Sequence, residues 1–144
     1  MKAMIRRHWL VLPLVLAGCG RIAELPPDLF PADAAGGWRR TEMRDLSVSD
    51  APDPVPRNEI ERLREAVYTT PAGGTGAPAL QVRIYQLQSA AMGLELVQRW
   101  RPSADTVFFN SGRYFVVVKW QSADRAALQA FIRELQQRLA RLPK

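Results

Sequence analysis

Histidine and cysteine are nearly absent from this sequence of 144 residues, which contains one of each, His8 and Cys19. Everything beyond position 19 therefore has neither an imidazole nor a thiol. That excludes Ser-His-Asp and Cys-His nucleophilic catalysis from this part of the chain, because both need an imidazole to take a proton. It also excludes disulfides, zinc sites built from Cys and His, and haem held by either residue.

Two other features of enzymes and membrane proteins are missing. The glycine-rich stretch at positions 73 to 76 lacks the lysine of a phosphate-binding loop and is typical of a turn. The apolar run from Trp9 to Leu16 is far shorter than the about 20 residues that cross a bilayer. The acidic residues lie mostly among arginines in polar stretches, as on a solvated surface. We therefore expect no catalytic residues, no cofactor and no metal site.

The first 19 residues have the layout of a secretion signal. Lys2, Arg6 and Arg7 precede the apolar run, and small residues follow it. Leu16-Ala17-Gly18-Cys19 resembles the lipobox of bacterial lipoproteins. The resemblance implies that residues 1–18 are removed by cleavage between Gly18 and Cys19, and that the Cys19 sulfur carries diacylglycerol. An ordinary signal with an unrelated cysteine is the alternative.

A lipid on Cys19 would decide where the protein resides. Two or more acyl chains anchor a protein stably, whereas one binds only marginally. In Gram-negative bacteria, an Asp directly after the lipidated cysteine retains a lipoprotein in the inner membrane. This chain has Gly20 at that position. The same resemblance therefore favours the outer membrane, facing the periplasm. Removing the signal leaves 17 basic and 14 acidic residues, a net charge of +3. Nucleic acid is not an expected partner for so weakly basic a secreted chain.

Composition divides the remaining chain into a tether and one domain. Residues 19–37 are rich in Pro and Ala and are expected to form a lipidated tether, from which Leu25, Leu29 and Phe30 could pack back on the domain. Residues 38–144 are expected to form a single domain. Pro52, Pro54 and Pro56 interrupt it with a long loop.

Hydrophobic periodicity predicts the secondary structure of this domain. Strands are expected at residues 38–43 (an edge strand), 63–70, 79–87, 106–109 and 114–120. Helices are expected from the N-cap Ser89 to Trp100, and from the N-cap Ser122 to about Leu142. Residues 110–113 are expected to form a hairpin turn in which Gly112 adopts a positive φ.

These elements form two strand-strand-helix units behind a leading edge strand. They predict an α+β domain with an antiparallel sheet of four to five strands and both helices on one face. The last strand is apolar on both sides, because Val116 and Val118 alternate with Phe115 and Val117. The second face would then be covered by the proline loop or by the strand containing Trp38, or it would be an exposed docking surface.

Several segments resemble those of an uncharacterised family of bacterial secreted domains and lipoproteins. The similarity covers about residues 38–142 and rests on four short segments: Gly37-Trp38-Arg39, Glu65-Ala66-Val67-Tyr68, Ser89 to Pro102, and Phe108 to Tyr114. It implies a secreted α+β fold. It implies no catalytic residue.

The sequence favours a non-catalytic envelope lipoprotein that binds an envelope protein or a glycan. Aromatic and arginine side chains are enriched at such surfaces, so the candidate partner surface consists of Arg99, Trp100, Arg101, Arg113 and Tyr114. The alternative is that Trp100 belongs to the core and that Arg99 and Arg101 only complement the dipole at the end of the helix. One alternative is a carboxylate-dependent hydrolase or transferase that uses acids near the core, namely Glu95, Asp105 and Asp124. Another is a structural subunit of an envelope complex.

Overall fold

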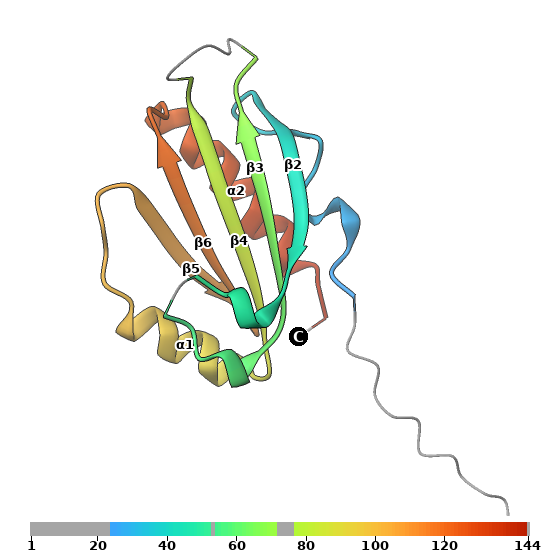
Figure 1. Ribbon diagram of the computed structural model, residues 1–144. Helices are drawn as coiled ribbons and strands as arrows, with labels where there is room; N and C mark the ends of the chain where they lie inside the picture. Colours follow the sequence, from blue (N-terminus) through green and yellow to red (C-terminus); the bar gives the residue numbers. More distant parts are fainter. Residues whose placement is uncertain (1–23, 53, 72–76, 144) are drawn as a thin grey trace, which may run out of the picture.

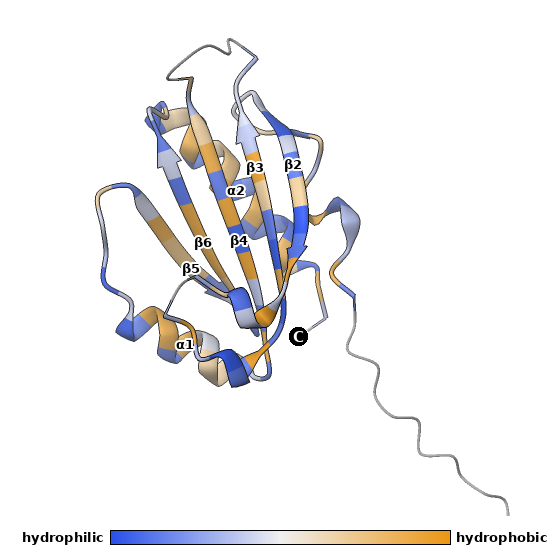
Figure 2. Cartoon of the chain, in the orientation of Figure 1, coloured by the Kyte–Doolittle hydropathy of each residue, from blue (hydrophilic) through white to orange (hydrophobic). Residues whose placement is uncertain are grey.

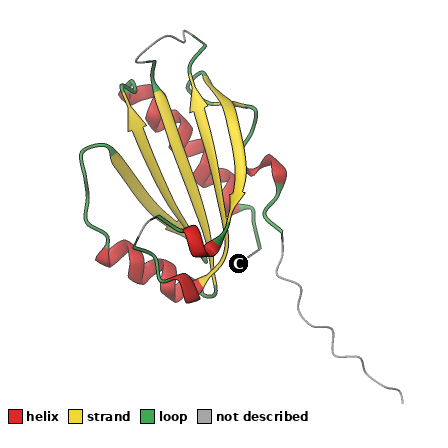
Figure 3. Cartoon of the chain, viewed as in Figure 1, coloured by secondary structure: helices red, strands yellow, loops and turns green. Residues whose placement is uncertain are grey.

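A computed structural model describes residues 24–52, 54–71 and 77–143, and within them the chain folds into an antiparallel sheet with two α-helices (Figure 1). The sheet order is β1-β2-β3-β4-β6-β5. The strands are β1 (Asp33–Ala34), β2 (Trp38–Leu46), β3 (Ile60–Thr69), β4 (Ala79–Leu87), β5 (Thr106–Ser111) and β6 (Tyr114–Gln121). The helices are α1 (Ala90–Arg99) and α2 (Arg125–Ala140), and three short 3-10 turns lie at Pro27–Leu29, Val48–Asp50 and Arg57–Glu59 (Figure 3).

The predicted α+β class is confirmed, but the predicted strand number is wrong. The sheet has six strands because the short strand β1 pairs with the beginning of β2, with Ala34 opposite Trp38. As a result β2 is not the outermost strand of the sheet. Only its first residues, Trp38 and Arg39, pair with β1. β2 is also longer than expected, and it is mostly hydrophilic, in contrast to the apolar stretches of β4 and β6 (Figure 2).

The two helices lie on opposite faces of the sheet, which corrects the prediction that both share one face. Val116 and Val118 of β6 pack in one core cluster with Phe131 of α2, whereas Phe115 and Val117 pack in another with Leu96 of α1. Successive strand residues point to opposite faces, so the clusters lie on opposite sides. We call the α2 side the back face and the α1 side the front face (Figure 1).

Several local predictions are confirmed. β4 has the expected bounds, Ala79–Leu87. The Ser89 hydroxyl accepts a hydrogen bond from the Met92 N–H at 3.3 Å and so caps α1. Gly112 has a φ of 57° in the turn between β5 and β6.

The predicted N-cap of the final helix is wrong. The cap is Asp124, whose carboxylate accepts a hydrogen bond from the Ala127 N–H at 3.0 Å. Ser122 instead has a φ of 53° in the turn that leaves β6. Ser and Asp are both good N-caps. Here the turn after β6 includes Ser122, and the helix starts only after Asp124.

The back core includes part of the segment predicted as a tether. Leu25, Leu29 and Phe30 are 3%, 2% and 1% exposed and pack with α2 and with Trp38 and Tyr68 of the sheet. We call residues 25–31 the N-terminal strap. Folding back of these three side chains was expected, and with it the core includes residues that precede position 38.

The front core is smaller and is built from α1, the proline loop and the sheet. Ala51 and Val55 of the loop are buried against β3 and β4, beside Leu96 of α1. The second sheet face is thus covered by the proline loop, one of the two expected covers, together with α1. Trp38, the other expected cover, packs on the back face.

Candidate functional site

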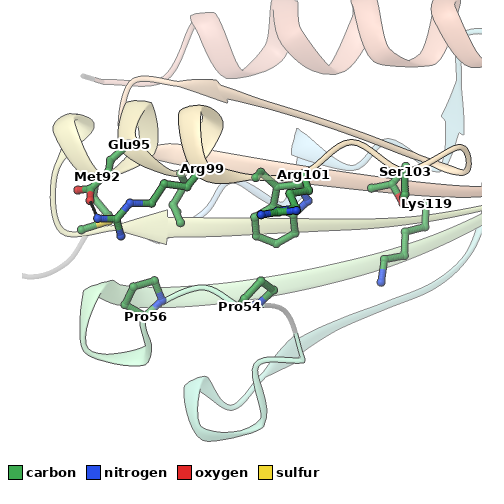
Figure 4. A pocket seen from close by; sticks show the side chains of 11 residues that line it. Pro54, Pro56, Met92, Glu95, Arg99, Arg101, Ser103 and Lys119 are labelled. Atoms are coloured by element: carbon green, nitrogen blue, oxygen red, sulfur yellow. Dashed lines mark ion pairs between the residues drawn. The ribbon is translucent and has the colours of Figure 1, made fainter.

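A groove of about 520 Å³ lies on the front face between α1 and the proline loop. Pro54 and Pro56 form one side, and α1 with the chain that follows it forms the other (Figure 4). The lining is apolar in its walls and charged at its rim: Pro54, Pro56, Met92, Glu95, Leu96, Arg99, Trp100, Arg101, Ser103, Thr106 and Lys119.

The end of α1 positions three of these residues. Trp100 leaves the helix in an extended conformation, with φ −67° and ψ 132°, while its N–H still donates to the Leu96 carbonyl at 2.8 Å. Its ring packs 5.1 Å from the Phe115 ring and 6.0 Å from the Phe108 ring, measured between centroids. Trp100 is therefore a half-buried wall of the groove, and the neighbouring Arg99 and Arg101 are exposed.

The groove carries an excess of positive charge. Its lining contains three cationic side chains and one acidic one. Glu95 pairs with Arg99 at 2.6 Å, one helical turn away (Figure 4). The Arg101 side chain is exposed, and it makes no hydrogen bond or ion pair with the other described residues. Lys119 lies at the far end of the groove, on β6.

The structure divides the predicted partner surface into two places. Arg99, Trp100 and Arg101 meet at the groove. Arg113 instead donates to the Leu87 carbonyl at 2.9 Å and pairs with Glu61 at the start of β3. Tyr114 is 6% exposed and packs in the back core.

A buried charge cluster on the front face escaped the sequence interpretation. Glu65 of β3 is 2% exposed, and its carboxylate accepts hydrogen bonds from Arg83 (2.7 Å), Arg44 (2.7 Å) and Gln81 (3.1 Å). Burial by itself raises the pKa of Glu65, but the hydrogen bonds from Arg83 and Arg44 outweigh it and hold the pKa below its ordinary value. The cluster joins three adjacent strands, β2, β3 and β4, so it stabilises the sheet.

The three acids considered for catalysis each have a local contact. Glu95 pairs with Arg99, and Asp124 caps α2. Asp105 accepts hydrogen bonds from the Ser103 and Thr106 hydroxyls at 3.0 and 3.1 Å, and these bonds lower its pKa. Within the described residues, no group of three or more His, Cys, Asp or Glu side chains is placed to hold a metal ion.

Gly18 and Cys19 lie outside the described residues, so the lipidation site stays a prediction. In the part of the chain that the structure describes, no helix has the length and apolar character needed to cross a membrane. No family model, curated protein or solved structure matches this chain. The resemblance to uncharacterised secreted domains therefore also stays a prediction.

Proposed function

We propose that this chain is an envelope lipoprotein, lipidated on Cys19, whose domain is a non-catalytic binding module for an acidic protein or glycan partner. The N-terminal motif supports the anchor, and Gly20 favours the outer membrane facing the periplasm. The partner occupies the groove between α1 and the proline loop. Arg113 and Tyr114 have no part in it.

The composition and rigidity of the groove carry this proposal. Tryptophan and arginine dominate the binding energy of many interfaces. Trp100 is already held by Phe108 and Phe115, so binding would cost little ordering of its ring. The exposed Arg99 and Arg101 flank that ring, and their two positive charges against the one negative charge of Glu95 favour an acidic partner.

Photo-crosslinking from the groove tests the binding site. A benzophenone amino acid replaces Met92 in the full-length chain, and adducts formed in the native envelope are identified by mass spectrometry. We expect one dominant adduct that disappears when Arg99→Ala and Arg101→Ala are added. The matched control is Arg125→Ala with Arg133→Ala, since these arginines are exposed on α2 at the opposite face. An adduct that survives the first pair unchanged would contradict the groove.

Metabolic labelling with a radioactive fatty acid tests the anchor separately. We expect the wild-type chain to take up label and the Cys19→Ser variant to take up none. Label on the Cys19→Ser variant would rule out this anchor and leave the groove untouched.

A further inference from the structure

The N-terminal strap is fixed to the domain by donors that point at its main chain. Arg64 donates to the Leu25 carbonyl at 3.0 Å, Arg138 to the Asp28 carbonyl at 2.9 Å, and Tyr68 to the Pro31 carbonyl at 3.0 Å. Arg40 donates to the Phe30 carbonyl. Together with the three buried side chains of the strap, these bonds fix the strap on the domain.

The strap lies close in the chain to the proposed lipid. Five residues, 20 to 24, separate Cys19 from Leu25. Six Cα-to-Cα steps of at most about 3.6 Å span roughly 20 Å, even when the chain is fully extended. Leu25, the first residue of the strap, therefore lies within roughly 20 Å of a lipidated Cys19. The tether between lipid and domain is thus much shorter than the predicted tether of residues 19–37.

The strap emerges at one particular end of the sheet. Glu24 lies 4.0 Å from Arg62, near the start of β3. A hollow of about 100 Å³ is shared by Pro26 and Leu29 of the strap and by Arg141 and Leu142 after α2. We call this the strap end. Its charges are mixed, because Asp28 and Arg138 line the same hollow as Arg141, and the Arg141 side chain is exposed.

We propose that the strap end rests on the lipid surface, so that the domain is held in one orientation at the membrane. This inference rests on the lipid anchor of the proposed function. The opposite end of the sheet, at Gln121, then points away from the bilayer. Tyr114 lies beside the chain that ends α2, and the seven residue steps of β6 from Tyr114 to Gln121 cover roughly 23 Å.

Fluorescence quenching on liposomes tests the orientation. The lipidated full-length chain carries a dye at Ala140→Cys, on the strap end, or at Gln121→Cys, on the far end; both residues are exposed. The liposomes contain a lipid with a nitroxide quencher on its headgroup. We expect quenching at position 140 to be several-fold stronger than at position 121. Equal quenching of the two dyes on a chain that floats with the liposomes would overturn the orientation and leave the anchor intact.

A matched variant separates the short tether from other causes. Twenty Gly and Ser residues inserted between Arg21 and Ile22 add a root-mean-square reach of about 25 Å. We expect this insertion to abolish the difference between the two dyes, and an unchanged difference would contradict the role of the strap. A chain that never floats with the liposomes lacks the anchor, which overturns the proposed function and this inference with it.

Discussion

Glu65 is a buried carboxylate that depends on two arginines. Arg83 is only 10% exposed in its side chain and pairs with Glu65 at 2.7 Å, so replacing Glu65 would break a buried ion pair. We expect Glu65→Gln to lower the free energy of unfolding by about 3 kcal/mol. Urea unfolding followed by circular dichroism measures this loss.

Glu42 provides the matched control for Glu65. It pairs with the same Arg44, at 3.6 Å, but is 55% exposed. Exposed pairs contribute at most about 1 kcal/mol, so Glu42→Gln should change stability little. Equal losses in the two variants would contradict a special role for the buried carboxylate.

The same carboxylate makes the stability depend on pH. The folded-state pKa of Glu65 lies below its ordinary value of 4.5, because the hydrogen bonds from Arg83 and Arg44 outweigh the effect of burial. The folded protein therefore binds this proton more weakly than the unfolded chain, and stability is lost as pH falls below about 4.5. We expect the difference in unfolding free energy between wild type and Glu65→Gln to shrink as pH falls from 6 to 3. A constant difference in urea titrations across this range would contradict the assignment.

Individual residues show where sequence patterns stop being informative. The alternation of β3 places Glu65 on the same face as the buried Leu63, and this signal was present in the sequence. Composition also predicts that Arg113 lies on the same partner surface as Arg99. In the structure Arg113 instead pairs with Glu61, which is 52 positions away in the chain. A contact of that sequence separation depends on which strands become neighbours, and no local pattern contains that information.

At the scale of elements, the start of α2 provides a direct test. Asp124 accepts the Ala127 N–H, whereas Ser122 has a positive φ. We expect Asp124→Ala to cost about 1 kcal/mol, the usual loss of an N-cap. Ser122→Gly should be neutral or stabilising, because glycine adopts a positive φ without strain. Thermal unfolding measures the stability of both variants. If Ser122→Gly lowered the stability more than Asp124→Ala, Ser122 would be the N-cap.

The packing of α1 on the β5–β6 turn depends on a glycine. A Cβ on Gly93 would lie 2.8 Å from the Gly112 carbonyl oxygen, which is main chain and cannot rotate away. Alanine would gain about 1 kcal/mol in helix propensity but would incur an overpacking cost of about 1–3 kcal/mol. We expect Gly93→Ala to be destabilising on balance in chemical denaturation. Gln98→Ala, a change at an exposed position of the same helix, should alter the stability little. A Gly93→Ala protein more stable than wild type would show that the β5–β6 turn shifts to make room for the new Cβ.

Element positions were predictable to the extent that they depend on local periodicity. The clean alternation of β4 gave its bounds, and Ser89 and Gly112 gave a cap and a turn. The side of the sheet that each helix covers was not predictable in this way. The apolar stripe of α1 shows that Leu96 is inward, but both faces of β6 are apolar, so either could receive it. The groove was partly predictable, because Arg99, Trp100 and Arg101 are consecutive, whereas Pro54 and Pro56 reach it only through the fold.

At the scale of the whole molecule, the domain has two cores that share one sheet. β4 and β6 contribute to both, with Ile84 and Val116 on the back and Tyr85 and Phe115 on the front. The back core depends on residues before the sheet begins. The strap completes this core, and the proposed lipid site lies six positions before it in the chain. The proposed anchor would therefore link membrane attachment to folding through the same seven residues.

Removal of the strap tests this linkage. A chain starting at Ala32 keeps β1 but loses Leu25, Leu29 and Phe30, all nearly fully buried. Burying three such side chains contributes roughly 5–9 kcal/mol, at about 1.5–3 kcal/mol each. That amount is comparable to the entire stability of an ordinary domain, about 5–15 kcal/mol. We therefore expect the chain from Ala32 to lose its cooperative thermal transition, while a control chain starting at Glu24 keeps it. Equal melting temperatures for the two chains would show that the strap is a detachable tether and that the domain begins after it.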